Sequence, residues 1–516
     1  MEDTGRMRLI PIIGLEVHVR LKTKSKMFSD CPNVDDAAAP NTAIDPVSTG
    51  QPGALPAVNA EAVRLGVRAG LALGCRIPDQ AHFDRKNYFY PDLPKGYQIS
   101  QFDHPIAEHG AITIEVSGQK APRDVIRVGV TRAHLEEDAA KNTHDASSNA
   151  TLVDFNRAGV PLLEIVSEPD LRSPAEAKAY VQEIQAIMRA IGASEADMEK
   201  GYLRCDANIS MMEVDENNRS IQPEFNPKTE IKNLNSFRSV ERALTYEIER
   251  QSAMLAKGDV PQAATRGWDE NKGQTFEQRS KETSADYRYF PEPDLPALDL
   301  RSVAEEEKAA LPPLPAERRA ALIADYGFSA EDARFFVANG WTDYAEDVMG
   351  ELAGWIESSD DTKKSAGTIL DEQKQKLGKL AGGWLTSKLA GLLAAQDKTI
   401  ADVKITAEDF AEFLHMVDEG TINSTNAQKL LGLMLETGKD PSHLLEEHNL
   451  GQMNDPAALA KLVSELIAQN PEQVEQIKAG KVALVKWFVG VIMKSTEGRA
   501  NPSAAEGEVK KQLGIG

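Results

Sequence analysis

A proline-rich break at residues 312–315 divides this chain of 516 residues into two parts with different periodicities. The segment Pro312-Pro313-Leu314-Pro315 cannot continue a helix or a central strand, because proline lacks the backbone N–H that either would use. Before the break, apolar and polar residues alternate in short segments, which is the pattern of half-buried strands. After it, the chain is rich in Ala, Leu, Glu and Lys at helical spacing. We therefore expect an α+β protein, with a sheet domain followed by helices.

The first clear strand is expected over residues 15–21. Apolar residues at odd positions alternate there with polar residues at positions 16, 18 and 20. Glu16 and His18 therefore share one face, about 6–7 Å apart at roughly 3.3 Å per residue. A carboxylate and an imidazole at this spacing suit one metal ion or one phosphate cluster. An ordinary polar sheet face is the alternative interpretation.

Residues 82–104 crowd cations, aromatic side chains and prolines into one short segment. Prolines at 91 and 94 and a glycine at 96 exclude a long helix, so we expect a loop held between flanking strands. Lys86, Lys95 and the neighbouring aromatic residues favour a phosphorylated ligand, because lysine supplies charge and the rings supply a stacking face. The alternative is a proline-rich connector with solvated lysines.

Further carboxylates follow in three places. The segment 134–138 (HLEED) is either a solvated turn or a ligand cluster for a divalent cation. Glu164 interrupts an apolar strand expected over 160–166, where a carboxylate needs a cation or a metal to offset its desolvation. A strand over 201–212 places Arg204, Asp206 and Asn208 on one face. Several carboxylates and one imidazole without a cysteine suit a hard cation such as Mg²⁺ and its phosphate ligand.

The remaining elements follow from periodicity and capping residues. Strands are also expected over 111–116, 125–130 and 230–237. Helices are expected over 60–74, 174–191, 240–257, 316–326, 330–339, 406–418, 424–437 and 456–468, with an apolar helix within 480–501. The chain has no GxxxxGK[ST] and no GxGxxG at a strand–helix junction, which argues against a P-loop or a Rossmann site.

Composition limits the class of protein further. The net charge of −22 argues against indiscriminate nucleic-acid binding, because phosphate contact needs local cation density. No run of about 18 apolar residues is present, so no membrane span is expected, and residues 1–8 carry no apolar signal-peptide core. The three cysteines (Cys31, Cys75 and Cys205) are far apart and form no CxxC pair. We therefore expect a cytoplasmic protein without disulfides.

Taken together, these segments resemble the B subunit of the tRNA-dependent aspartyl/glutamyl amidotransferase. The resemblance rests on residues 13–19 (IGLEVHV), 52–59 (PGALPAVN), 83–92 (FDRKNYFYPD), 97–101 (YQISQ), 134–138 (HLEED), 161–170 (PLLEIVSEPD), 203–208 (LRCDAN) and 232–237 (KNLNSF). It covers the first 300 residues densely and the remainder more loosely.

The resemblance implies a cradle-like domain with a mixed or antiparallel sheet over 1–300, a helical domain over 301–408 and a small YqeY-like helical tail over 409–516. It also implies an activity in which ATP and Mg²⁺ serve to phosphorylate the side-chain carboxylate of Glu or Asp carried by a mischarged tRNA. Ammonia released from glutamine by the A subunit would displace the phosphate to give Gln-tRNA or Asn-tRNA. A small C subunit would complete a heterotrimer, and the tail would contact the tRNA.

The same resemblance assigns roles to particular residues. The Mg²⁺ ligands would be Glu16, His18, Glu137, Glu164 and Asp206, with Glu136 nearby. Catalysis would rest on Glu16, His18, Glu137, Glu164 and Lys86. ATP or the acyl phosphate would be held by Lys86, Asn87, Tyr88, Lys95, Ser100 and Gln101. Some members of the family bind zinc through two cysteine pairs, but only Cys31 stands in that region here, so no zinc is expected.

Two other functions are open to a chain of this kind. One is a tRNA-binding scaffold without its own chemistry, and the presence of Glu16, His18 and the other carboxylates argues against it. The other is a free-standing ATP-dependent carboxylate–amine ligase. The chain has no glutaminase-type Ser/Lys arrangement, which fits a need for a partner protein.

Overall fold

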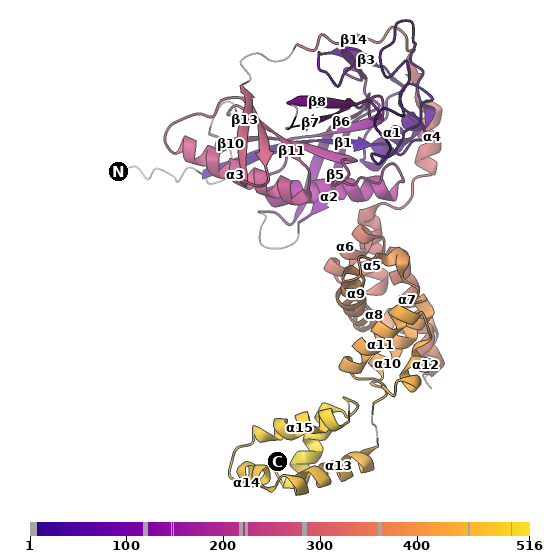
Figure 1. Ribbon diagram of the computed structural model, residues 1–516, viewed down its shortest axis with the longest axis vertical. Helices are drawn as coiled ribbons and strands as arrows, with labels where there is room; N and C mark the ends of the chain where they lie inside the picture. Colours follow the sequence, from indigo (N-terminus) through magenta and orange to yellow (C-terminus); the bar gives the residue numbers. More distant parts are fainter. Residues whose placement is uncertain are drawn as a thin grey trace. The chain divides into compact units, whose positions relative to one another are not determined.

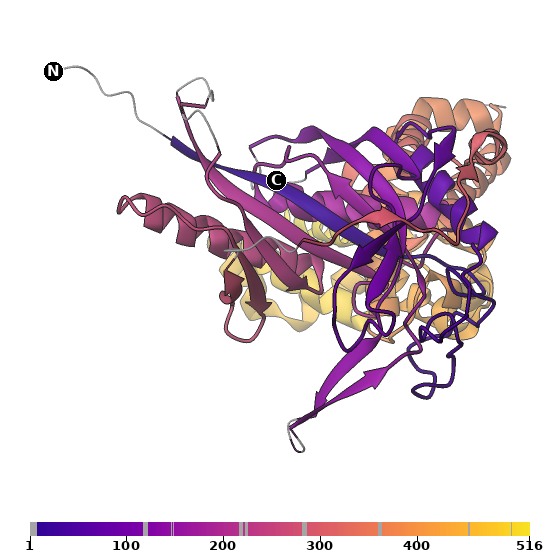
Figure 2. The same ribbon diagram turned by 90° about the horizontal axis from the view of Figure 1, so that it is seen from above.

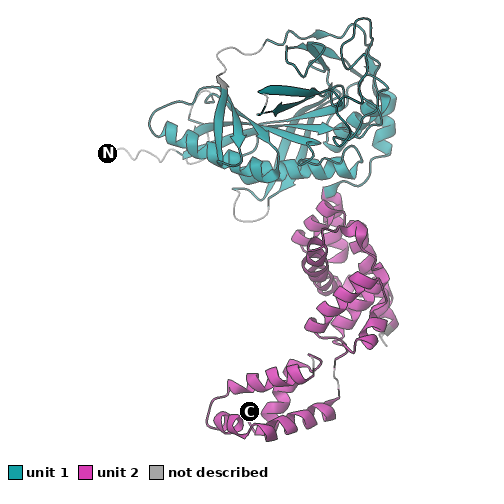
Figure 3. Ribbon diagram, viewed as in Figure 1, with its two compact units in different colours: residues 1–315 teal, residues 316–516 magenta. Residues whose placement is uncertain are grey.

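The computed structural model describes residues 8–116, 122–145, 147, 149–215, 220–221, 225–280, 286–359, 364–452, 455–496 and 498–515. The chain forms two compact units, residues 1–315 and 316–516 (Figure 3). The boundary falls at Pro315, the last residue of the proline-rich break. A large mixed sheet in the first unit and helices throughout the second confirm the α+β class.

Unit 1 is built on a sheet with the strand order β13-β12-β11-β10-β1-β9-β6-β5. All neighbouring strands are antiparallel except β11 and β12. The strands of unit 1 are β1 (Arg8–Arg20), β2 (Gln80–Ala81), β3 (Asp84–Asn87), β4 (Tyr97–Ser100), β5 (Ala107–Glu115), β6 (Val125–Glu137), β7 (Lys141–Asp145), β8 (Ala150–Asp154), β9 (Pro161–Ser167), β10 (Leu203–Val214), β11 (Thr229–Leu234), β12 (Ala264–Asp269), β13 (Gln274–Ser280), β14 (Phe290–Pro291) and β15 (Leu298–Asp299). Its helices are α1 (Ala60–Ala72), α2 (Pro174–Ala190), α3 (Phe237–Leu255) and α4 (Arg301–Ala309).

One face of this sheet is covered by α1, α2 and α3 (Figure 1). The apolar residues of β1 at positions 13, 15, 17 and 19 point to that face and are at most 1% exposed. The polar residues between them therefore lie on the opposite face, as the alternation predicts. The sheet thus buries its helix-covered face and leaves the other available for a site.

The helix boundaries follow from their capping residues. Ser173 caps α2 by accepting a hydrogen bond from the backbone N–H of Glu176, and Pro174 occupies the first turn. Gly192, just beyond its end, has a φ of +68°. The expected helices at 174–191, 330–339 and 424–437 are confirmed to within one residue. The strand expected over 230–237 ends earlier, at Leu234, because Ser236 caps α3.

Two expectations need correction. The acidic segment 134–138 is not a solvated turn, because β6 runs to Glu137 and both Glu136 and Glu137 are only 3% exposed. Residues 82–104 are not one loop, because β3 and β4 pair within them and leave only residues 88–96 as the connection. A third short strand, β14, completes this small sheet by pairing with β3. A separate hairpin, β7–β8, projects from unit 1 (Figure 2).

Unit 2 consists of helices. They are α5 (Pro315–Tyr326), α6 (Ala330–Asn339), α7 (Thr342–Ser359), α8 (Ala366–Gly382), a π-helical turn (Gly383–Leu389), α9 (Ala390–Ala394), a 3₁₀ turn (Ile400–Asp402), α10 (Ala407–Asp418), α11 (Ser424–Thr437), α12 (Pro441–Glu447), α13 (Pro456–Gln469), α14 (Pro471–Lys478), α15 (Leu484–Ser495) and α16 (Pro502–Leu513). One hydrophobic core lies within residues 322–450 and another within 459–513. In the described part of the chain, every helix is too short or too polar to cross a membrane.

Candidate functional site: a carboxylate–histidine row on the open face of the sheet

Strand register places four polar side chains side by side on the open face. Arg204 of β10 lies opposite His18 of β1, which lies opposite Glu164 of β9, which lies opposite His134 of β6. Residues paired directly across neighbouring strands project to the same face. Four strands that are far apart in sequence thus build one row, in which Glu164 lies between two imidazoles and Arg204 lies beyond His18.

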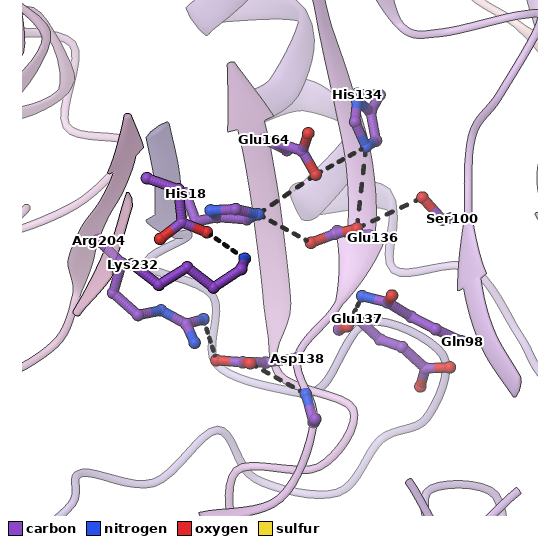
Figure 4. A network of polar contacts seen from close by, with 12 residues as sticks. His18, Gln98, Ser100, His134, Glu136, Glu137, Asp138, Glu164, Arg204 and Lys232 are labelled. Atoms are coloured by element: carbon purple, nitrogen blue, oxygen red, sulfur yellow. Dashed lines mark hydrogen bonds and ion pairs between the residues drawn. The ribbon is translucent and has the colours of Figure 1, made fainter. Parts of the chain in front are cut away.

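The central members of this row are in direct contact (Figure 4). His18 Nε2 lies 3.2 Å from Glu164 Oε2, and His134 Nε2 lies 3.3 Å from the same oxygen. Glu136, two residues beyond His134 on β6, approaches both imidazoles at 3.8 Å. Ser100 of β4 donates a hydrogen bond to Glu136 at 3.4 Å. Two carboxylates and two imidazoles therefore form one polar network.

Burial and charge shift the pKa values of this network in opposite directions. Burial lowers the pKa of His18, but Glu164 and Glu136 outweigh that effect and the pKa is raised. The same balance raises the pKa of His134 to about 9. Burial raises the pKa of Glu164, but His134 and His18 hold it well below its usual range. The imidazoles thus supply positive charge between the carboxylates.

The donor set also fits a divalent cation, which would take the place of the proton on His18, because a ligating imidazole must be neutral. Ligand atoms of His18, Glu136 and Glu164 all lie within 4.8 Å of one another. One imidazole nitrogen and carboxylate oxygens are suitable ligands, and three protein ligands leave positions for water and phosphate oxygens. The two protein oxygens favour a hard cation over a thiophilic one.

Basic and acidic side chains together line a cavity of about 340 Å³ beside this cluster. Its lining includes His18, Lys86, Tyr88, Gln98, Glu136, Asp138, Arg204, Asp206 and Lys232. Arg204 donates a hydrogen bond to Asp138 at 2.6 Å, and Lys232 contacts Asp206 at 2.7 Å. Lys86 lies over the rings of Tyr287 and Tyr88, 5.2 and 6.0 Å from their centroids. The cavity therefore offers positive charge next to a candidate metal position.

The other expected metal ligands lie in two different places. Glu16 and Asp206 face each other across β1 and β10, two residues along the strands from His18 and Arg204. Asn208 donates a hydrogen bond to Glu16 at 2.9 Å. Glu137 is held apart from the cluster, because its carboxylate pairs with Lys95 and accepts a hydrogen bond from the Ile99 backbone at 3.0 Å.

Of the residues expected to bind the nucleotide, some lie at the cavity and others do not. Lys86 and Tyr88 line the cavity, and Ser100 contacts Glu136. Asn87 instead binds the backbone of residues 287 and 288, with its side chain donating to the Arg288 carbonyl at 2.8 Å. Gln101 is buried and accepts hydrogen bonds from the backbone N–H groups of Ile106 and Leu135.

Four residues of the site had been given no individual role from the sequence: His134, Asp138, Arg204 and Lys232. Alternation offered a signal for some of them. His134 and Glu136 are two apart on one strand and so share a face, as Arg204 and Asp206 do. No sequence pattern, however, shows which strands become neighbours, since register is set by long-range packing.

Comparison with known proteins identifies relatives along nearly the whole chain. Residues 11–305 match the family model described as GatB/GatE catalytic domain, and residues 368–513 match the one described as GatB domain. A protein of Bacillus licheniformis is 44% identical over 96% of this chain and 97% of its own length. Proteins of Thermotoga neapolitana (41% identical, 98% of this chain and 99% of its own length) and Synechococcus elongatus (43%, 97% and 97%) are similarly close. All three are named as the B subunit of an aspartyl/glutamyl-tRNA(Asn/Gln) amidotransferase.

Proposed function

The chain belongs to the family of aspartyl/glutamyl-tRNA(Asn/Gln) amidotransferase B subunits, and on that premise we propose that it activates the side-chain carboxylate of a mischarged aminoacyl-tRNA. The carboxylate of Glu or Asp attacks the γ-phosphorus of ATP, which releases ADP and gives an acyl phosphate. Ammonia then attacks the acyl carbon and releases phosphate, leaving the amide. The observation that carries the proposal is the row of acids and imidazoles beside a cation-lined cavity.

We assign the Mg²⁺ site to His18, Glu136 and Glu164. Their ligand atoms are already within reach of one ion, and their own strands fix them in place. When bound, Mg²⁺ would neutralise charge on the phosphate oxygens. Glu16 and Asp206 lie on the same face two residues along the strands, so they would contact the ion through a water molecule or through the substrate.

We assign binding of the transferring phosphoryl group to Lys86, Arg204 and Lys232. Phosphoryl transfer depends chiefly on positioning and on charge stabilisation, so cations matter more than a protein nucleophile. Arg204 and Lys232 are held by Asp138 and Asp206, which orients them before the substrate arrives. The pair formed by Lys95 and Glu137 ties β6 to the segment 88–96 and so supports the cavity wall.

The proposal includes partners. The A subunit of the amidotransferase would supply ammonia from glutamine, the C subunit would join both in a heterotrimer, and the helical tail would contact the tRNA. The name shared by the relatives refers to tRNA and to one of several subunits, which supports this assembly. We place the protein in the cytoplasm, where its three buried thiols stay reduced.

The test compares two adjacent carboxylates in the assembled complex. Glu136 faces His18, whereas Glu137 faces Lys95. With Glu136→Gln, we expect loss of the ATP turnover that mischarged tRNA stimulates, while hydrolysis of free glutamine continues. With Glu137→Gln, the Mg²⁺ concentration needed for half-maximal turnover should stay at the wild-type value, although the protein will be less stable.

If Glu136→Gln retained full ATP turnover, the metal assignment would be wrong. If the wild-type complex bound mischarged tRNA but never hydrolysed ATP with it, a scaffold without chemistry would replace the proposed function.

A further inference from the structure

Five aromatic rings from three segments form a continuous row beside the cavity. In order along the row they are Tyr90, Tyr88, Tyr287, Tyr289 and Phe102, and we call them the aromatic row. The centroids of consecutive rings lie 6.0, 5.9, 6.2 and 4.3 Å apart. The last pair is stacked face to face, with 12° between the ring planes. The other three pairs meet edge to face, with 65°, 73° and 71° between their planes.

This row is held in place by specific contacts. The row is continued by β14, which runs antiparallel beside β3 and pairs Phe290 with Arg85. The Asn87 backbone N–H donates to the Tyr287 carbonyl at 2.8 Å, and its side chain donates to the Arg288 carbonyl at 2.8 Å. The Tyr88 hydroxyl donates to Gln98 at 3.2 Å.

Both ends of the row are open to solvent while its middle borders the cavity. Tyr90 is 58% exposed and Phe102 is 41% exposed. Tyr88 lines the cavity, and the Lys86 ammonium lies 5.2 Å from the centroid of Tyr287. Because most neighbouring rings meet edge to face, each ring presents a face of its own, which suits several successive bases, each stacked on a separate ring.

An arginine, Arg288, lies within the row between Tyr287 and Tyr289 in the sequence. Arg288 is exposed and has a φ of +43°, a conformation that costs energy in a residue with a side chain. Within the described residues, its guanidinium has no hydrogen-bond or ion-pair partner. An arginine presented between Tyr287 and Tyr289 is suited to a backbone phosphate of a single strand.

We propose that the aromatic row is the platform on which the unpaired bases at the 3′ end of the tRNA stack, with the terminal adenine on Tyr287. This inference rests on the proposed function, because the amino acid is esterified to that terminal nucleotide. Stacking there brings the aminoacyl group to the cavity next to Lys86. Single-stranded ends are recognised in this way by aromatic side chains, and each stacked base contributes separately to affinity.

The experiment measures equilibrium binding of the assembled complex to two uncharged tRNAs, one intact and one lacking the terminal adenosine, without ATP or glutamine. The wild type should prefer the intact tRNA by about 5- to 150-fold, the range for one stacked base. Tyr287→Leu should reduce that preference to near unity, and Tyr287→Phe should keep it, because it retains the ring face. Phe276→Leu, which alters an exposed ring on β13, is the matched control.

Two further variants measure the contributions of the open end of the row and of the arginine to tRNA binding. Phe102→Leu changes an exposed end of the row and remains informative if Tyr287→Leu does not fold. It should weaken binding of both tRNAs equally, because the bases that precede the terminal adenosine are present in both. Arg288→Ala should also weaken both equally and should reduce the slope of log affinity against log salt by about 0.7, the value for one phosphate of a single strand.

Three outcomes would overturn the inference. One is an unchanged preference for the terminal adenosine in Tyr287→Leu. Another is weaker equilibrium binding of ATP by Tyr287→Leu with unchanged tRNA binding, which would place the adenine of ATP on the row. The third is failure of the complex to assemble, which would make the row a protein contact. Since no turnover is needed, failure of the Glu136→Gln test would leave this binding result intact.

Discussion

Arg204 uses only part of its hydrogen-bonding capacity in the cavity. One guanidinium nitrogen donates to Asp138, while Nε is buried without a partner among the described residues. A buried donor without a partner is costly, so a phosphate oxygen arriving in the cavity would satisfy it. The residue is therefore prepared for an anionic substrate.

Replacing Arg204 should therefore impair phosphoryl transfer. We expect Arg204→Lys to lower the kcat of tRNA-stimulated ATP turnover by about 10²-fold, in the range for loss of one preorganised donor, since a point charge lacks the planar fork. Steady-state kinetics of the complex measures this, with glutamine hydrolysis as the internal control. Wild-type turnover in the variant would remove Arg204 from the site.

At the scale of residues, the sequence shows which side chains share one face of a strand, but not which strands lie next to each other. The period of two along β1 correctly grouped Glu16 with His18. The same period separates Glu136 from Glu137, because Glu136 is two residues from His134 and joins it at the cluster, whereas the Glu137 carboxylate contacts Lys95 and the Ile99 backbone instead. The contact between His18 and Glu164 depends on β1 pairing with β9, which no local pattern specifies.

At the scale of elements, α1 packs unusually close to the sheet at Gly70. A Cβ placed there would lie 2.5 Å from the Cβ of Ala107 on β5. The helix can approach the strand this closely only because glycine has no side chain. Gly350 of α7, by contrast, has open space around its absent Cβ.

The two glycines predict opposite responses to the same substitution. Gly70→Ala should destabilise unit 1 by about 1–3 kcal/mol through overpacking. Gly350→Ala should stabilise unit 2 by up to about 1 kcal/mol, because alanine is the better helix former. Chemical denaturation of each variant measures both effects. A stabilising Gly70→Ala would show that α1 can move away from β5 at little cost.

Glu412 on α10 makes the stability of unit 2 depend on pH. Burial raises the pKa of this carboxyl to about 7, and the neighbouring carboxylate of Asp440 adds to the effect. The folded state therefore holds the proton more tightly than the unfolded state. The stabilisation from this bound proton is complete at pH values below the usual pKa of a glutamate, near 4.5, and is lost as the pH rises towards 7.

Glu412→Gln should remove this dependence, because an amide stays neutral at every pH. We expect the variant and the wild type to melt together near pH 4, with the variant melting higher at pH 8. Thermal unfolding monitored by circular dichroism at the two pH values makes the comparison. A variant that melts lower at pH 8 would mean that the ionised carboxylate stabilises α10.

At the scale of the whole molecule, α4 belongs to unit 1. The Glu307 side chain is fully buried and lies 2.7 Å from Arg64 Nη2 and 2.6 Å from Arg68 Nε, both on α1. Removing the partner of a buried charge is more damaging than removing a surface ion pair. Leu311 and Leu314 also pack against the core of unit 1.

The length of a stable first fragment follows from these contacts. In the sequence, the prolines at 312–315 mark the end of unit 1, whereas the family resemblance places a boundary at 300. The nine residues of α4 lie between these two positions. The reason to keep them is the buried contact of Glu307 with α1, which joins residues some 240 positions apart in the sequence. We expect residues 1–315 to fold alone and residues 1–300 to unfold at a lower temperature, because both arginines lose their partner and apolar core surface becomes exposed. Thermal unfolding of the two fragments decides this, with Glu307→Gln in the longer one as control for the ion pair. Equal melting temperatures would show that α4 is an appendage and that the core of unit 1 is complete at residue 300.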